Sequence, residues 1–564
     1  MDQNRLLIAI VISIGILIGF ELLAPHQAVR QVTPALIAAS VAPGVSTDNE
    51  AAGPNGPRVP ITAPRVEGSI ELVGAKFDDL VLRDYHETVD PKSPQVRVLE
   101  SRGAEPAYLQ YGWLADTPGT AVPDNNTQWT ADGANLSPTT PVTLSWNNGQ
   151  GLVFALKIAI DDNYMFSVTQ TVRNTGTKPI TLRPWSRVRR GYTPSVASLG
   201  GQDALLGEFG GRLQEMTYKS AKSDAEKADG IAYQADSTGG WSGISDKYWL
   251  TAVIPDQAVA VTTQFRDLTL PSGDGWQVDY TATNGQTVAP GAAIDFASQA
   301  FAGAKKVQLL DRYEAANNIP NFSKAIDFGW FYFVSKPIFY ALDWLYGKIG
   351  NFGLAIMVLT VGVKILFFPL ANRSYVSMNK MRLLAPKMQA IRERFKDDPT
   401  QMQAETMALY KAEKVNPASG CLPLVVQLPV MIALNTDLRN SIEMRHAAFF
   451  GWIHDLSAPD PTNLFNLFGL LHFDPTTYAS WALVGAWPII MGALMYFSQR
   501  LNPPMPDPVQ ARMMQFMPLV FTFMMARYSA GLVIYWSWNN LLSLGQQWLI
   551  TRPSRIAAST PAKS

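Results

Sequence analysis

Hydrophobic and polar positions alternate with a period of two through much of the first half of the chain. In residues 152–160 every second side chain is apolar, and the alternation resumes after the polar turn at 161–163. Residues 258–265 and 276–282 show similar alternation, and Gly, Pro, Asn and Asp are frequent between such segments. This pattern is typical of strands with one buried face, joined by tight turns. Residues 66–318 are therefore predicted to form a large antiparallel β-sandwich.

The second half is dominated by apolar runs instead. A span needs about 20 apolar residues to cross a bilayer as a helix. One apolar run lies near the N-terminus, Leu6–Leu23, and contains a single charged residue, Glu21. The five later runs are Phe352–Leu370, Cys421–Leu438, Tyr478–Phe497, Met513–Met525 and Gly531–Ile550. The pattern predicts an α-helical membrane protein with six transmembrane helices, the last two forming a tight hairpin.

The remaining segments complete the predicted domain organisation. Residues 24–65 are rich in Pro, Ala, Gly and Ser and are predicted to be a linker. Residues 321–349 combine many aromatic residues with spaced charges, which predicts an amphipathic helix lying at a membrane interface. The predicted domains are an anchor (1–23), the linker, the β domain, the interfacial helix, a five-span core (350–550) containing a helical hairpin (371–420), and a basic tail (551–564).

The N-terminal run has two interpretations. A cleaved signal peptide also has a basic residue, here Arg5, before an apolar core. The run is longer than a usual signal core and no small-x-small cleavage site closes it. An uncleaved anchor is therefore favoured.

Loop charges predict the orientation. The 371–420 loop carries nine Lys and Arg residues, whereas residues 439–477 carry two against four acidic residues. The positive-inside rule places the 371–420 loop and both termini in the cytoplasm. The β domain then lies outside the cytoplasm.

Composition excludes several functions. The net charge is zero, so there is no general attraction to nucleic acid, and the single cysteine excludes an intramolecular disulfide. Nucleotide-binding glycine patterns, HExxH and GxSxG are absent from the sequence. His446 and His454 lack a plausible set of further metal ligands. We therefore expect no enzymatic activity, no cofactor and no metal site.

Several polar residues interrupt the apolar runs. Lys364 follows Phe352 by twelve residues, about 18 Å along a helix, which places it in the cytoplasmic half of the bilayer. One interpretation is a lysine that extends to the headgroups, with the other polar residues joining helices by hydrogen bonds. The other is an internal, water-filled groove. The candidate groove residues are Lys364, Thr360, Gln427, Asn435, Trp536, Asn540 and Ser543.

The 371–420 loop has its own helical pattern. Met381, Leu384, Met388, Ile391 and Phe395 follow a 3-4-3-4 spacing, which predicts one apolar seam. Asp398 and Pro399 fit the N-cap and first position of a returning helix. The hairpin is either a solvated structure or a docking arm for headgroups or a ribosome. The candidate contact residues are Arg382, Lys387, Arg392, Arg394, Lys396 and Asp398.

Between Phe328 and the last span the chain contains the strings FGWFYFVSKPIF, SYVSMNKMRLLAPKMQAIRERFKDDP, MALYKAEKVNPASGCLPLVVQLPV, SAGLVIYW and GQQWLI. In these strings the chain resembles the YidC/Oxa/Alb family of membrane protein insertases, especially its Gram-negative members. The resemblance covers the five later spans and the segments that connect them in the cytoplasm. The N-terminal MDQNRLLIAI is also similar to the start of that family.

The resemblance implies insertion of nascent inner-membrane proteins without nucleotide hydrolysis, alone or with the Sec translocon. It also implies that the spans cross the inner membrane of a bacterium and that the β domain lies in the periplasm. It implies a groove open to the cytoplasm and to lipid, and contacts with the ribosome and the signal-recognition targeting machinery. The groove cation of the family is usually arginine, and Lys364 stands there in this chain. Lysine keeps the positive charge but lacks the planar guanidinium group with which arginine binds a carboxylate through two parallel hydrogen bonds. Thr360 and Gln427 correspond to groove positions, Trp536 corresponds to a substrate-contact position, and the β domain resembles a sugar-mutarotase-like sandwich.

Three other functions remain open on sequence grounds. Secondary transporters commonly contain internal repeats and pairs of interrupted helices, and the five spans show neither feature. A membrane-anchored periplasmic carbohydrate-active protein would leave the five spans without a role. A scaffold or chaperone for other membrane proteins is the alternative nearest to an insertase.

Overall fold

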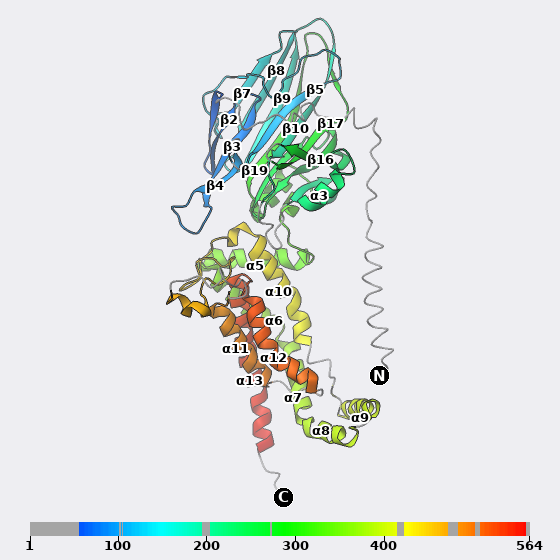
Figure 1. Ribbon diagram of the computed structural model, residues 1–564, viewed down its shortest axis with the longest axis vertical. Helices are drawn as coiled ribbons and strands as arrows, with labels where there is room; N and C mark the ends of the chain where they lie inside the picture. The colour runs from blue at the N-terminus through cyan, green and yellow to red at the C-terminus, as the bar shows by residue number, and fades with distance from the viewer. Residues whose placement is uncertain are drawn as a thin grey trace. The chain divides into compact units, whose positions relative to one another are not determined.

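The computed structural model describes residues 56–100, 103, 105–194, 204–270, 273–396, 398–413, 415, 422–471, 483–501 and 508–559. The described residues divide into two compact units. The β unit runs to Asp327 and includes Asn440–Glu443. The helical unit contains Phe328–Arg439 and the residues from Met444 onward. Figure 1 shows the strands and helices of each unit.

The β unit contains two antiparallel sheets. The larger has the order β1-β2-β3-β4-β5-β10-β17-β16-β13, with β18 paired to β10, and the smaller the order β12-β11-β14-β15-β19-β9-β8-β7-β6. The strands of the larger sheet are β1 (Arg58–Thr62), β2 (Val66–Glu71), β3 (Lys76–His86), β4 (Gln95–Glu100), β5 (Ala107–Ala115), β10 (Ile180–Arg190), β13 (Ile231–Thr238), β16 (Ala260–Leu270), β17 (Gly273–Ala282) and β18 (Gln286–Val288). Those of the smaller are β6 (Thr130–Ala131), β7 (Val142–Asn147), β8 (Leu152–Ile160), β9 (Met165–Asn174), β11 (Ala204–Phe209), β12 (Arg212–Thr217), β14 (Trp241–Ser245), β15 (Trp249–Pro255) and β19 (Ala293–Ala304).

The hairpin expected from residues 152–168 is present. β8 and β9 pair antiparallel around the turn, with Leu156 opposite Gln170. The apolar positions of β8 are buried and its other positions are more exposed, so the period of two reflects one face turned to the core. The segments predicted at 258–265 and 276–282 lie in β16 and β17, which also pair with each other. The predicted antiparallel sandwich is confirmed.

The predicted boundaries of the β domain need correction at both ends. β1 lies inside the predicted linker (24–65), because Val59 and Ile61 of RVPIT alternate inward and are buried. Pro60 is tolerated since β1 is an edge strand. At the other end, helix α4 (Val307–Ala316) and the 3-10 turn η2 (Phe322–Ala325) follow β19. A further short helix, α3 (Tyr218–Ala225), follows β12.

The helical unit is built from nine described helices and one described 3-10 turn. Its α-helices are α5 (Tyr332–Ile349), α6 (Phe352–Leu366), α7 (Phe368–Leu383), α8 (Ala385–Arg394), α9 (Pro399–Ala412), α10 (Leu422–Asn440), α11 (Ala486–Leu501), α12 (Pro508–Met525) and α13 (Ala530–Ser559). Its 3-10 turn is η5 (Leu464–Gly469). A further 3-10 turn, η4 (Ile442–Met444), begins in the segment that belongs to the β unit. α11 packs against α12 and α13, and α6 packs against α5 and α13.

The run predicted as one span from Phe352 to Leu370 is broken. α6 ends at Leu366 and α7 starts at Phe368, because Pro369 in the first turn of α7 has no N–H to continue the α6 ladder. Among the described residues, no single helix meets length and hydropathy criteria for crossing a membrane, whereas α6 and α7 taken together do, across a bend of 69°.

Other predicted bounds shift in the helical unit. The interfacial helix predicted from residue 321 starts at Tyr332, just after Gly329, which has a left-handed φ of 68°. The last helix continues through most of the predicted tail, to Ser559. The last two apolar runs are predicted to form a tight hairpin. The short connection is present, since α12 ends at Met525 and α13 begins at Ala530, and both helices pack against α11. The predicted anchor (1–23), Cys421 and residues 478–482 of the predicted third core run lie outside the described residues.

The predicted seam of the 371–420 hairpin lies on two helices instead of one. The chain breaks at Leu384, between α7 and α8, because Pro386 occupies the first turn of α8. The seam is still apolar core: Leu384 and Met388 pack with Tyr410 and Val415. α8 packs against α9, so the predicted helical hairpin is present within the described part of this loop.

Candidate functional site

Lys364 connects two helices of the helical unit. Its Nζ donates a hydrogen bond to Ser543 Oγ at 2.6 Å, joining α6 to α13. Ser543 Oγ in turn donates to the carbonyl of Asn539 at 2.8 Å, so the hydroxyl is fixed in an accepting orientation toward the lysine. A second bond between these helices runs from Trp538 Nε1 to the Met357 carbonyl at 3.1 Å. The cation is therefore held against α13.

The contact to Ser543 does not neutralise Lys364. A serine hydroxyl is uncharged, and within the described chain no carboxylate forms an ion pair with this ammonium group. Lys364 is also half-buried among apolar neighbours on α6. A cation in this setting keeps capacity to bind an anionic or polar group.

Thr360 lies one turn before Lys364 and is buried. Its Oγ1 donates to the Ile356 carbonyl at 2.6 Å, so the hydroxyl hydrogen is used within α6. The threonine oxygen keeps acceptor capacity on the Lys364 side of the helix.

Gln427 and Asn435 on α10 have different surroundings. Gln427 Nε2 donates to the hydroxyl of Tyr535 on α13. Asn435 is half-buried, and its Oδ1 has no hydrogen-bond partner among the described residues. Sequence reasoning missed Tyr535, although it adjoins Trp536. The α13 pattern placed Trp536 on the polar face and left Tyr535 unassigned, and only the neighbouring helix shows that Tyr535 faces Gln427.

Trp536 and Asn540 follow along α13. The Trp536 ring stacks against Phe521 of α12 with centroids 6.3 Å apart. Asn540 Nδ2 donates to the Trp536 carbonyl at 3.0 Å. The structure thus joins Lys364 directly to Ser543, and Gln427 to α13, whereas Thr360, Trp536 and Asn540 bond or stack elsewhere. The polar side chains come from α6, α10 and α13.

The hairpin candidates have mainly structural contacts. Asp398 caps α9 by accepting from the backbone N–H groups of Thr400 and Gln401 at 3.1 and 3.0 Å, as predicted. Lys387 Nζ forms an ion pair with Glu413 at 2.7 Å, on the surface. The Arg394 guanidinium lies over the ring of Phe395. Arg382, Arg392 and Lys396 add positive charge around the hairpin.

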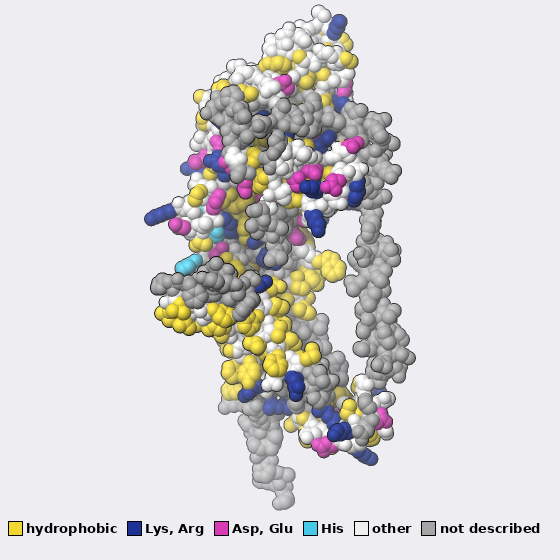
Figure 2. Space-filling view, viewed as in Figure 1, with side chains coloured by type: hydrophobic (Ala, Val, Ile, Leu, Met, Phe, Trp, Pro, Cys, Tyr) yellow, Lys and Arg dark blue, Asp and Glu magenta, His cyan; other side chains and the backbone are white. Residues whose placement is uncertain are grey.

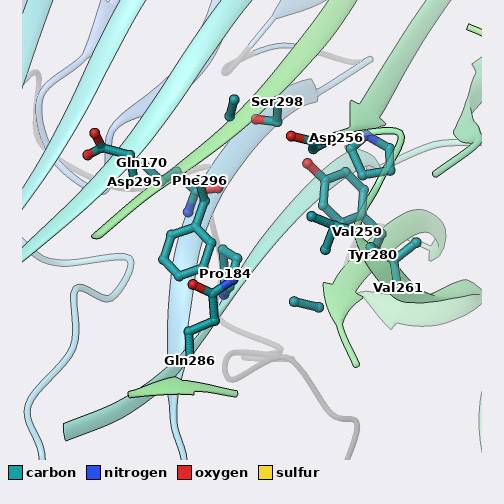
Figure 3. A pocket seen from close by; sticks show the side chains of 13 residues that line it. Gln170, Pro184, Asp256, Val259, Val261, Tyr280, Gln286, Asp295, Phe296 and Ser298 are labelled. Atoms are coloured by element: carbon teal, nitrogen blue, oxygen red, sulfur yellow. The ribbon is translucent and has the colours of Figure 1, made fainter. Parts of the chain in front are cut away.

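A pocket in the β unit offers a test of the carbohydrate alternative (Figure 3). Its polar lining is already engaged: Ser298 Oγ donates to the Val168 carbonyl, and Asp256 accepts from the Ala258 N–H. Asp295 accepts from Thr171 Oγ1 at 2.6 Å. Burial raises the pKa of the lining Tyr280 to about 12, so its hydroxyl stays protonated at neutral pH. The two carboxylates of this lining, Asp256 and Asp295, thus each hold a neighbouring donor of the β unit in place.

Comparison with known proteins covers both units. A family model described as 60Kd inner membrane protein matches residues 344–557, and one described as YidC periplasmic domain matches residues 58–341. The membrane protein insertase YidC of Granulibacter bethesdensis is 56% identical and covers 100% of both chains. That of Acidiphilium cryptum is 50% identical over 90% of this chain and 86% of the relative.

A solved structure, an active YidC insertase with its first transmembrane domain resolved, covers 88% of this chain and 92% of its own. It is 20% identical to this chain, with a TM-score of 0.37. The family of this chain is therefore assigned from the sequence relatives and not from this structure. These relatives match 90–100% of this chain and share one name. The chain therefore belongs to the YidC family of membrane protein insertases.

Proposed function

We propose that this chain inserts nascent inner-membrane proteins through a polar groove formed by α6, α10 and α13, with Lys364 as its working cation. The observation that carries the proposal is the Lys364 ammonium group, which contacts Ser543 on α13 but pairs with no carboxylate in the described chain. The family assignment supports insertion as the function, and the Lys364–Ser543 contact supports the groove as its location.

The proposed mechanism is electrostatic and needs no nucleotide. Lys364 attracts an acidic or polar segment of the incoming chain into the groove, where the oxygen of Thr360 and the amides of Gln427 and Asn435 replace part of its hydration. Drawing this segment partway into the membrane shortens the apolar layer that it must cross. The following apolar segment of the substrate then enters lipid, and its burial supplies the driving force.

The proposed topology has six spans with both termini in the cytoplasm. Its support is the charge difference between the 371–420 and 439–477 loops. The α8–α9 hairpin then faces the cytoplasm, where ribosomes and the signal-recognition targeting machinery deliver nascent chains. We place the Sec translocon beside the helical unit as a second route for larger substrates.

The proposed interfacial role of α5 and the segment just before it has its own support. Trp330, Phe333 and Trp344 are 82%, 73% and 64% exposed. Large aromatic rings are enriched at the boundary between headgroups and acyl chains. Lys336 and Lys348 on the same helix suit the headgroup side.

The test is insertion of a short membrane protein with an acidic translocated segment into proteoliposomes, scored by protease protection. We expect Lys364→Ala to lower insertion about tenfold or more, the loss of one charge-assisted contact. Lys364→Arg should restore it. Ser543→Ala should give a smaller loss, because the cation remains but is no longer held toward α13.

Lys380→Ala is the matched control, since Lys380 is an exposed lysine on the adjacent helix α7. It removes the same net charge and should insert as the wild type does. Equal insertion by wild type and Lys364→Ala would refute the proposed role of Lys364 and favour a lysine that extends to the headgroups. Failure of the wild type itself would refute insertion by this chain alone.

A further inference from the structure

An exposed apolar loop lies between α10 and α11 and has no role in the groove. Residues 463–471, NLFNLFGLL, contain no Asp, Glu, Lys or Arg. Leu470 is 77% exposed, Leu467 51% and Phe468 49%. Leu464, Phe465 and Leu471 are also exposed. We call residues 464–471 the apolar loop; Figure 2 shows hydrophobic side chains gathered where Figure 1 draws this segment in light orange.

The backbone of the apolar loop satisfies many of its own polar groups. The Phe468 N–H donates to the Asn463 carbonyl at 2.7 Å, and the Leu471 N–H donates to the Asn466 carbonyl at 3.0 Å. Asn463 Oδ1 accepts from the Phe465 N–H at 2.9 Å. Internal pairing of this kind lowers the cost of moving a non-helical turn out of water.

The base of the loop is fixed to α11. The Leu464 N–H donates to the Val484 carbonyl at 2.8 Å. Asp460 is buried, and its two carboxylate oxygens accept from Trp452 Nε1 at 3.1 Å and from the Trp487 N–H in the first turn of α11 at 2.9 Å. The base of the loop is therefore held in place relative to α11.

Two residues at the tip hold a backbone conformation that is unfavourable for them. Leu467 has φ 53° and ψ 46°, and Phe468 has φ 58° and ψ 32°. Both lie in the left-handed region, which crowds the Cβ of such residues. Strained positions persist where surroundings compensate for them. Because both side chains are about half exposed, their contacts within the chain offset only part of the free-energy cost of this backbone conformation.

We propose that the apolar loop inserts into the lipid leaflet on the side of the membrane where α10 and α11 are joined. The family is one of inner-membrane proteins, and both flanking helices present exposed apolar side chains, Ile432 on α10 and Phe497 on α11 among them. Phe450 and Trp452, before the loop, are exposed as well. Aromatic and aliphatic side chains without charges are typical of the boundary between headgroups and acyl chains.

A protein partner fits this surface less well. A stable protein–protein interface uses about 20–30 residues from each side, and the apolar loop has eight. Lipid requires no matching surface, only apolar area and satisfied backbone groups. The loop would then fix the depth of α11 in the bilayer through Asp460 and Trp487. This inference depends on the membrane location of the family and not on the groove or on Lys364.

The test is the depth of a fluorophore in vesicles. Cys421→Ser removes the native cysteine, and Leu470→Cys then takes an environment-sensitive probe in the full chain, reconstituted in phosphatidylcholine and phosphatidylglycerol vesicles. Thr139→Cys, at an exposed turn of the β unit, is the water control, and Ile365→Cys, exposed on α6, is the membrane comparison. Lipids with a nitroxide near the headgroup or near the bilayer centre serve as quenchers.

We expect the probe at Leu470 to emit at shorter wavelength than at Thr139, and to be quenched several-fold more by the shallow nitroxide than by the deep one. Quenching by aqueous iodide equal to that at Thr139 would overturn the proposal. Shielding from both iodide and nitroxide, together with cross-linking between two copies at Leu470, would also overturn it in favour of a dimer contact. A Phe465→Cys probe checks that the result does not depend on the one substitution.

Discussion

At the scale of single residues, a lysine and an aspartate in the helical unit have contrasting surroundings. Lys364 has an acceptor on a neighbouring helix. Asp437 on α10 is fully buried, and neither of its carboxylate oxygens has a hydrogen-bond partner among the described residues. Burying a carboxyl group without a partner is costly in free energy. Asp437 is thus a weak point of the packing next to Leu438, whose side chain contacts the start of α13 at Gly531.

The surroundings of Asp437 lead to a stability prediction. Asp437→Leu should raise the free energy of unfolding by about 1–3 kcal/mol, since a buried polar group without partners is replaced by an apolar one with the same branching at Cγ. The measurement is the midpoint of thermal unfolding in detergent, followed by near-ultraviolet circular dichroism. Asp437→Asn is the matched control and should change the midpoint less, because the amide still needs partners. A lower midpoint for Asp437→Leu would mean that water or lipid satisfies the carboxyl group.

The sequence did not show which of the candidate site residues contact one another. Helical spacing placed Asn540 and Ser543 on one face of their helix and Thr360 beside Lys364, which the structure agrees with. Spacing says nothing about which helices are neighbours, so the Lys364–Ser543 and Gln427–Tyr535 contacts had no sequence signal. Pairings between helices depend on the three-dimensional packing of side chains.

At the scale of helices and strands, a helix cap and a hairpin turn could be predicted from the sequence, whereas a break in a helix and a short edge strand could not. The N-cap at Asp398 and the β8–β9 hairpin follow from short-range patterns, and both are present. The α6–α7 bend and β1 were missed. Apolarity continues across the bend, so hydropathy hides it, and β1 lies in a Pro- and Gly-rich stretch whose composition suggests a linker.

The cap of α9 gives a prediction at this scale. Asp398→Ala should destabilise the first turn of α9 by about 1 kcal/mol, because the Thr400 and Gln401 N–H groups lose their acceptor. Hydrogen–deuterium exchange of residues 400–402 should speed up about fivefold. Glu405→Ala, an exposed acid on the same helix, should leave these amides unchanged. Unchanged exchange in Asp398→Ala would contradict the capping role and leave Asp398 free to act in docking.

At the scale of the whole molecule, the division into two units was predictable because the hydrophobic period changes. A period of two gives way to long apolar runs near residue 320, and the units separate after Asp327. The return of Asn440–Glu443 to the β unit was not predictable, since it depends on contacts such as that of the Glu443 carboxylate with the Val307 N–H at 2.9 Å. Contacts between segments so distant in sequence leave no local pattern.

The β unit should fold without the helical unit, and its internal ion pair tests this. In a 56–327 fragment both sheets keep their strands, although α4 loses the Glu443 contact. Arg190 is buried and binds Asp246 through two hydrogen bonds of 2.6 and 2.7 Å. Asp246→Ala should lower the free energy of unfolding by about 2–3 kcal/mol. This is less than for a fully buried pair, because the Asp246 side chain is 25% exposed.

Urea denaturation of the fragment, followed by tryptophan fluorescence, measures this loss. Asp84→Ala is the matched control: it breaks a more exposed pair with Arg65 and should lower the free energy of unfolding by less than about 1 kcal/mol. A single cooperative transition with the larger loss in Asp246→Ala would establish an independent domain whose stability depends on its own buried charges. A fragment without a cooperative transition would show that the β unit needs residues 440–443 or the helical unit to fold. Equal losses in the two variants would show that Arg190 is solvated in solution.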